Sequence, residues 1–223
     1  MNELAKTYEQ VFAGEPWNEY KKCSGAACEK SFGLETKGVD VCPCPNETML
    51  TPFYPRTDTL ATIAKETDRI GAVLQTRRND QNEIIGFVWG YPTTLSEFLD
   101  EKYKTIEGRR EVIKALYENS ITEKFFYFSE TGVIPEARGR GMSNEFAKVM
   151  VEEAERLRLP LVMRTNWQSP MIAVAGKFGM EQILGPETFA LEGKTYQTGK
   201  IKSSFDPENP SRVLYVSTSV PRV

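Results

Sequence analysis

Apolar side chains along this chain follow the spacing of a helix in some segments and that of a strand in others. Residues 2–13 place Leu4, Tyr8, Val11 and Phe12 on one helical face. The same spacing predicts further helices from about residue 57 and over residues 93–102, 108–119, 143–158 and 169–178. Apolar or alternating runs between turn residues predict strands over residues 71–77, 83–91, 125–133, 159–166, 180–184 and 213–220.

The order of these elements predicts an α/β (α+β) fold with a mixed central sheet. The polar residues 79–82 form a turn, so the strands on either side of them are expected to make a hairpin. The strand over residues 159–166 is apolar enough for burial in parallel pairing. The stretch between residues 184 and 213 is mostly loop, with a second hairpin expected to turn at Glu192 and Gly193.

The segment from Val133 to Ser143 lies between a predicted strand and a long predicted helix. Gly139 and Gly141 let its backbone bend tightly and leave amide groups uncovered. Those amides come at a helix N-terminus, where the peptide dipoles favour an anion. Arg138 and Arg140 add positive charge, so the segment predicts a site for a phosphate or a pyrophosphate.

The spacing of the glycines narrows the choice of phosphate ligand. No Gly-Lys-Ser/Thr follows them, and the dinucleotide pattern G-x-G-x-x-G fails at Asn144. The pattern V-x-P-x-x-R-G-x-G resembles the coenzyme A loop of the GNAT superfamily of N-acetyltransferases, whose core is Q/R-x-x-G-x-G/A. Ser143 stands where that core has Gly or Ala. The alternatives are a basic turn without a ligand and an RNA contact of the Arg-Gly type.

The resemblance covers about residues 57–220 and is strongest over residues 127–180. It implies the GNAT fold, with the central sheet splayed at the coenzyme A site, and it implies acetyl-CoA as co-substrate. An amine acceptor would attack the thioester directly, without a covalent enzyme intermediate. The residues that the resemblance assigns to coenzyme binding are Val133, Ile134, Arg138, Gly139, Arg140, Gly141, Met142, Ser143 and Asn166.

Candidate catalytic residues follow from the same comparison. Glu130 lies near the reacting centre and can accept the amine proton, whereas the alternative for it is a surface charge. Tyr127 can line the acceptor cleft or be a core aromatic. The Tyr that many family members use to protonate the leaving thiolate is replaced by Ala175, which leaves Tyr196 and Tyr215 as candidates by residue type alone. The chain has no histidine, so the usual hydrolase triads are excluded.

All four cysteines fall close together, at Cys23, Cys28, Cys42 and Cys44. Two thiol pairs separated by a loop can supply four thiolates to a tetrahedral Zn²⁺, as in zinc ribbons. The spacing C-x4-C and C-x-C departs from the regular ribbon. We predict a closed structural zinc site; two disulfides or four free thiols are the alternatives.

These features predict two regions. Residues 1–56 would hold the N-terminal helix and the zinc-ribbon-like segment, and residues 57–223 the acetyltransferase domain with a helical insertion at about 93–120. The insertion either packs on a sheet edge or forms a lid over the acceptor site. Its acidic residues Glu97, Asp100 and Glu101 either attract a cationic amine or form a solvated face.

Composition restricts the remaining choices. The 223 residues carry a formal charge of −3, which argues against binding to nucleic acid. No apolar run is long enough to cross a membrane and the N-terminus is too polar for a secretory signal, so we expect a cytoplasmic protein. We therefore expect an N-acetyltransferase acting on an amine, small molecule or protein. The alternative is a coenzyme-binding pseudo-enzyme whose zinc ribbon docks a protein partner, and a homodimer is left open.

Overall fold

The computed structural model describes residues 1–25, 28, 30–185, 188–191, 194–197 and 212–217. Its α-helices are α1 (Asn2–Ala13), α2 (Arg56–Thr67), α3 (Leu95–Lys102), α4 (Ile106–Glu118), α5 (Met142–Leu157) and α6 (Met171–Lys177). Short 3₁₀ turns are η1 (Leu34–Thr36) and η2 (Pro135–Ala137). The strands are β1 (Lys21–Cys23), β2 (Ser31–Phe32), β3 (Leu50–Pro52), β4 (Val73–Arg78), β5 (Ile84–Thr94), β6 (Lys124–Val133), β7 (Leu161–Asn166), β8 (Met180–Leu184), β9 (Thr188–Leu191), β10 (Lys194–Gln197) and β11 (Arg212–Ser217).

The helices and strands predicted from apolar spacing are present, with ends that differ by a few residues. Helix α1 and strand β8 have the predicted bounds. Strands β9 and β10 pair antiparallel and confirm the second hairpin, whose turn at Glu192 and Gly193 lies outside the described residues. The spacing rules worked here because most of these elements bury one apolar face.

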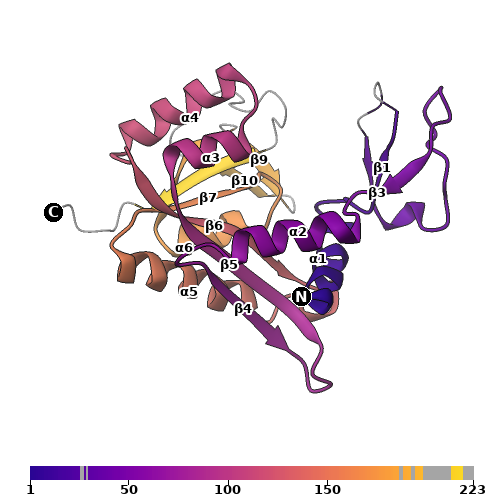
Figure 1. Cartoon of the computed structure of the whole chain (residues 1–223), viewed down its shortest axis with the longest axis horizontal. Coiled ribbons are helices and arrows are strands. Elements are labelled where there is room, and N and C mark those ends of the chain that lie inside the picture. The colour runs from indigo at the N-terminus through magenta and orange to yellow at the C-terminus, as the bar shows by residue number, and fades with distance from the viewer. Residues whose placement is uncertain (26–27, 29, 186–187, 192–193, 198–211, 218–223) are drawn as a thin grey trace. The chain divides into compact units, whose positions relative to one another are not determined.

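The main sheet has six strands in the order β4-β5-β6-β7-β11-β8. Strands β6 and β7 pair in parallel, and β11 pairs antiparallel with both β7 and β8, so the sheet is mixed as predicted. Figure 1 shows helices α3 and α4 on one face of these strands and α5 and α6 on the other. A separate small sheet, β2-β1-β3, carries the cysteine segment.

The chain divides into two compact units. The first comprises Met1–Asp68, Thr76–Phe87 and Gly132–Met142, and the second comprises Arg69–Gln75, Val88–Thr131 and Ser143–Val223. The core of the first unit is largely aromatic: the Tyr8 ring lies 4.5 Å from Phe12 and 5.7 Å from Phe87, centroid to centroid. The division predicted from the sequence, between residues 1–56 and 57–223, is a different division and stays a prediction.

The inserted helices α3 and α4 cover a face of the sheet, whereas the sequence left open packing on an edge or a lid over the acceptor site, and the lid stays a prediction. Buried Phe98, Leu99, Val112 and Leu116 form one cluster with residues of β6, β7, β8 and β11. Each helix has a threonine N-cap: Thr94 accepts from the Glu97 amide and Thr105 from the Gly108 amide. The two helices therefore complete the core of the second unit, and this burial is their structural role.

No helix among the described residues combines the length and the apolar character that a membrane crossing requires.

Candidate functional site

The predicted coenzyme loop follows directly from strand β6. After the turn η2, Gly139 and Gly141 adopt φ angles of +77° and +81°, and α5 begins at Met142. A Cβ on either glycine would meet no atom within 4 Å. Glycine is therefore favoured here by backbone conformation and not by crowding, because left-handed φ costs other residues about 1–2 kcal/mol.

The loop presents backbone donors. Within the part of the chain that the structure describes, no backbone carbonyl accepts a hydrogen bond from the amides of Gly139, Arg140 or Gly141. These amides lead into the first turn of α5, where further N–H groups have no partner inside the helix. Consecutive uncovered amides at a helix N-terminus form a concave anion site, which is the chemistry that a pyrophosphate needs.

The two arginines of the loop have different surroundings. Arg138 donates from Nε to the Val133 carbonyl at 3.1 Å, from Nη1 to Glu15 at 2.9 Å and from Nη2 to Val11 at 3.3 Å. Burial lowers the pKa of this guanidinium below its ordinary value, and it stays charged at neutral pH. Arg140 is exposed, as Arg138 is, but within the described residues it donates a single hydrogen bond, to the Glu136 carbonyl at 3.3 Å.

The end of strand β6 is fixed by its neighbours in the first unit. A Cβ on Gly132 would lie 2.7 Å from Phe87 and 2.7 Å from Val11, so this position requires glycine. The Ile134 amide donates to the Ile85 carbonyl at 3.0 Å. Because successive amides of a strand point in opposite directions, the Val133 amide points away from β5. Of the two positions predicted to meet pantetheine, Val133 thus has the better oriented donor.

Strands β6 and β7 separate in the second unit. Their pairing runs from Phe126↔Leu161 to Phe128↔Met163, although β6 continues to Val133 and β7 to Asn166. The sheet therefore opens beyond Phe128 and Met163, as the GNAT fold predicts.

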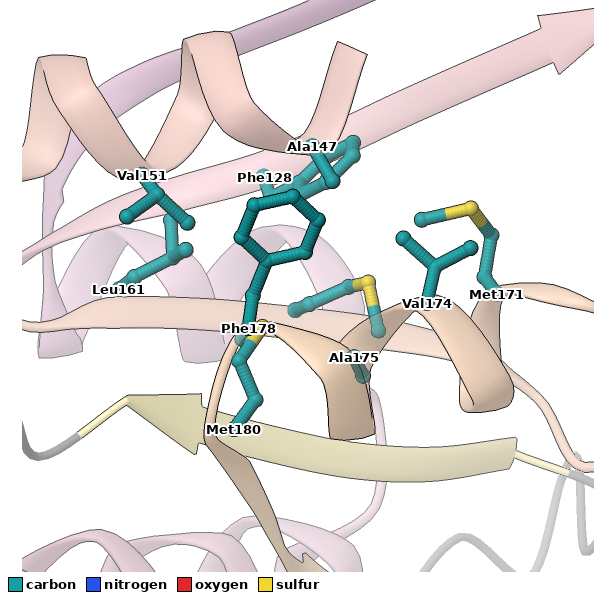
Figure 2. Close-up of a pocket in the computed structure, with 10 residues that line it drawn as sticks. Phe128, Ala147, Val151, Leu161, Met171, Val174, Ala175, Phe178 and Met180 are labelled. Atoms are coloured by element: carbon teal, nitrogen blue, oxygen red, sulfur yellow. The ribbon is translucent and has the colours of Figure 1, made fainter. Parts of the chain in front are cut away.

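An apolar layer lies where these strands begin to separate. Figure 2 shows Ala147 and Val151 of α5, Val174 of α6 and Phe178, the residue after α6, around Phe128 of β6. Ala175, which stands where the resemblance places a tyrosine, is buried in the same layer. The lining contains no polar side chain, so the layer anchors the two helices and offers no catalytic group.

Tyr127 and Glu130 do not share a face of β6, because residues three apart on a strand point to opposite sides. The Tyr127 ring is buried and lies 5.7 Å from the ring of Tyr91 and 4.9 Å from that of Phe98. The Lys102 ammonium lies 5.4 Å from its centroid. These contacts are those of a core aromatic. Glu130 is half-buried, and its role as base stays a prediction.

The remaining candidates have local roles. The Asn166 side chain accepts from the Gln168 amide at 2.9 Å and so shapes the turn before α6; its contact with pantetheine stays a prediction. The Tyr215 hydroxyl donates to Gln182 Oε1 at 3.1 Å, and burial raises the pKa of Tyr215 above its ordinary value, so it is a poor proton donor. The side chain of Tyr196 lies outside the described residues.

The acidic residues of α3 are engaged with neighbours in the same unit. Glu97 closes a capping box with Thr94, and hydrogen bonds from Thr94 lower the pKa of this carboxyl. Asp100 pairs with Arg109 at 2.8 Å, and Glu101 pairs with Arg69. These partners favour a structural role for the three carboxylates over attraction of a cationic amine.

The four cysteines converge in the first unit. Their Sγ atoms all lie within 4.8 Å of one another, with 3.7 Å between Cys28 and Cys42 and 4.0 Å between Cys23 and Cys44. None forms a disulfide. Thiolates bound to a tetrahedral Zn²⁺ at about 2.3 Å are about 3.8 Å apart, so these spacings suit that ion.

A residue that the sequence did not indicate lies against the sulfurs. Thr48 Oγ1 is 2.7 Å from Cys23 Sγ and 3.4 Å from Cys44 Sγ. Hydrogen bonds from the Thr48 hydroxyl and amide lower the pKa of Cys44 to about 6, whereas burial raises the pKa of Cys42 to about 12. No spacing rule would have singled out this threonine, because only the fold brings it between the two cysteine pairs.

Comparisons with known proteins bear on the fold. No family model matches the sequence, and no curated protein matches it. Among solved structures, a mosquito arylalkylamine N-acetyltransferase like 5b matches with a TM-score of 0.51 at 12% identity, covering 97% of this chain and 93% of that chain. An agmatine N-acetyltransferase matches with a TM-score of 0.48 at 12% identity, covering 96% and 92%.

A Drosophila melanogaster polyamine N-acetyltransferase matches with a TM-score of 0.45 at 13% identity, covering 75% of this chain and 83% of that chain. At these identities a match concerns the fold alone, and the mosquito structure carries that conclusion. The chain therefore has a mixed α/β fold of the GNAT acetyltransferase type.

Proposed function

We propose that this protein is an N-acetyltransferase that moves an acetyl group from acetyl-CoA to a primary amine by direct attack. The observation that carries the proposal is the glycine turn with uncovered amides that follows β6 and leads into α5. The second unit adds the opening between β6 and β7. An amide-lined turn suits a pyrophosphate, and a gap between strands suits an extended pantetheine arm.

Different residues of the loop would contact different parts of coenzyme A. The amides of residues 139–143 would hold the pyrophosphate, with Arg140 adding charge and Arg138 tying the loop to three backbone carbonyls. The outward amide of Val133 would pair with the pantetheine arm, and a nearby backbone N–H at the same strand end would polarise the thioester carbonyl. Acetyl-CoA supplies an activated thioester, so neither a nucleophilic side chain nor a histidine is needed.

The acceptor would lose a proton to Glu130, directly or through a water molecule. The departing thiolate of coenzyme A is a tolerable leaving group and would be protonated from water, since Ala175 and the buried Tyr215 offer no suitable donor. Similarity to a structure described as an arylalkylamine N-acetyltransferase supports an amine as acceptor. Which amine is accepted is outside the proposal.

We further propose that Cys23, Cys28, Cys42 and Cys44 bind one structural Zn²⁺. Four thiolates fill a tetrahedral coordination sphere and leave no position for a substrate, so the ion would stabilise the β1–β3 segment and take no part in acetyl transfer.

The test measures acetyl-CoA turnover, as release of free thiol, against a panel of arylalkylamines, polyamines, amino sugars and peptides. We expect coenzyme A to raise the melting temperature and at least one amine to be acetylated. Absence of any stabilisation by coenzyme A would overturn the proposal. Tight binding without turnover of any amine would instead favour a coenzyme-binding module that is not an enzyme. Ala175, in place of the expected tyrosine, is consistent with that alternative.

A further inference from the structure

The Thr48 hydroxyl contacts both halves of the cysteine cluster. Its Oγ1 atom lies 2.7 Å from Cys23, in the first cysteine pair, and 3.4 Å from Cys44, in the second. Thr48 is half-buried. Among the described residues, its hydroxyl is the side-chain oxygen that lies within hydrogen-bond distance of two cysteine sulfurs. Its position is thus between the two segments that a metal ion would join.

Both neighbouring segments hold this threonine in place. Its carbonyl accepts a hydrogen bond of 2.7 Å from the Cys42 amide, which ties its backbone to the second cysteine pair. On the other side, a Cβ on Gly25 would lie 2.9 Å from both Cγ2 and Oγ1 of Thr48. The Gly25 amide also donates to Cys23 Sγ at 3.4 Å. The hydroxyl is therefore confined beside the sulfurs and cannot turn away freely.

We propose that Thr48 is an outer-shell residue of the zinc site, donating its hydroxyl hydrogen to a zinc-bound thiolate and so strengthening metal binding. The inference rests on the proposed zinc site and is independent of acetyl transfer. A divalent ion with four thiolates leaves a net charge of about −2, and a nearby donor offsets part of that charge. A hydroxyl has a single hydrogen, so Cys23 receives it at the shorter distance.

The expected effect follows from the behaviour of other metal sites. Loss of an outer-shell hydrogen bond typically weakens metal affinity about 10–100-fold. Thr48→Val keeps the size and branching of the side chain and removes only the donor, whereas Thr48→Ser keeps the donor. Thr51→Val is the matched control, because the Thr51 hydroxyl lies in the same small sheet and donates to the Lys22 carbonyl at 3.5 Å.

The experiment measures zinc affinity by competition with a chromophoric chelator on the full-length protein. The absorption of the Co²⁺-substituted protein reports separately whether four thiolates still surround the metal. We expect a loss of about 10–100-fold for Thr48→Val, affinity close to that of the unchanged protein for Thr48→Ser, and no change for Thr51→Val.

Three outcomes would overturn the inference. Unchanged affinity in Thr48→Val would show that the hydroxyl is dispensable. Equal losses in Thr48→Val and Thr48→Ser would assign the effect to side-chain shape. Failure of the unchanged protein to bind zinc or cobalt would refute the metal site itself. Stabilisation of the same sample by coenzyme A would show that the proposed acetyltransferase site is independent of that failure.

Discussion

The glycine turn of the proposed coenzyme loop, at residues 138–142, and the cysteine cluster belong to the same compact unit but are built in opposite ways. In the loop, a Cβ on Gly139 or Gly141 would touch nothing, so the backbone conformation alone makes the site. In the cysteine cluster, four sulfurs and the Thr48 hydroxyl lie in contact, so side chains make the site. A backbone site tolerates changes of side chain that preserve φ, whereas a side-chain site depends on every neighbour.

The contrast extends to the supports of each site. Arg138 stabilises the loop through three backbone carbonyls, two of them at the end of α1 and just after it. The sulfurs instead are held by a short ladder in which Cys23 pairs with Leu50 and Val41 with Met49. The loop is supported by one long side chain and the cysteine cluster by local pairing of strands. Substitutions in the two regions should therefore affect stability and ligand binding differently.

The largest effect is expected from Cys42→Ser, because Cys42 is the most buried of the four cysteines. We expect loss of bound zinc and a destabilisation of several kcal/mol, since structural zinc supplies about 10–16 kcal/mol of apparent binding energy in small fingers. Metal analysis and denaturant unfolding measure both. Ser24→Ala, at an exposed neighbouring position, is the control and should behave as the unchanged protein. Stoichiometric zinc in Cys42→Ser would contradict a four-thiolate site.

The two loop arginines should separate stability from binding. Arg138→Gln removes donors from three carbonyls and should lower the free energy of unfolding by about 2 kcal/mol. Arg140→Gln should leave stability unchanged and weaken coenzyme A binding severalfold, more at low salt, because its charge is exposed. Thermal unfolding and calorimetry in two salt concentrations measure these effects. A reversed pattern would mean that Arg138 is the phosphate ligand.

Gly141→Val tests the claim that the loop is a backbone site. A β-branched residue at φ +81° costs about 1–2 kcal/mol, and relief of that strain would turn the amides away from the anion. We expect coenzyme A affinity to fall at least about tenfold. The control is Gly176→Ala, in helix α6 and without crowding, which should keep affinity and stabilise the helix by up to about 1 kcal/mol. Unchanged affinity in Gly141→Val would refute the proposed role of the amides.

The smallest effect concerns a helix of the second unit, outside both sites. Thr94→Ala removes the N-cap of α3 and should cost about 1 kcal/mol of unfolding free energy. Hydrogen bonds from Thr94 hold the pKa of Glu97 below its usual value of 4.5, so this stabilisation is present above that pH and lost as the pH falls through the lowered pKa. Of the bonds that Thr94→Ala removes, only the one from the Thr94 hydroxyl to the Glu97 carboxylate depends on pH, so the stability difference between Thr94→Ala and the unchanged protein should narrow in acid. The bond from the Glu97 amide to the Thr94 hydroxyl should keep part of that difference. Thr62→Ala, on an exposed face of α2, should show no such narrowing.

The sequence predicted much of the fold because apolar spacing reports burial. It also located the glycine turn before α5, since glycines spaced in this way before a helix form a short local pattern, and the role of that turn in coenzyme binding stays a prediction. It did not indicate that α3 and α4 cover a sheet face, because covering a face and covering an edge require the same apolar stripe. Nor did it separate the roles of Arg138 and Arg140, whose difference depends on carbonyls more than a hundred residues away, at Val11 and Glu15.

By itself, the sequence determined which atoms this protein can offer: glycine amides before a helix, four thiols in two pairs, and no imidazole. Only the tertiary structure decided which of them meet. It opened the sheet between β6 and β7, assigned Arg138 to the backbone and placed Thr48 against two sulfurs. Local patterns set the conformation of short segments, whereas contacts between distant segments depend on packing, which no short pattern encodes.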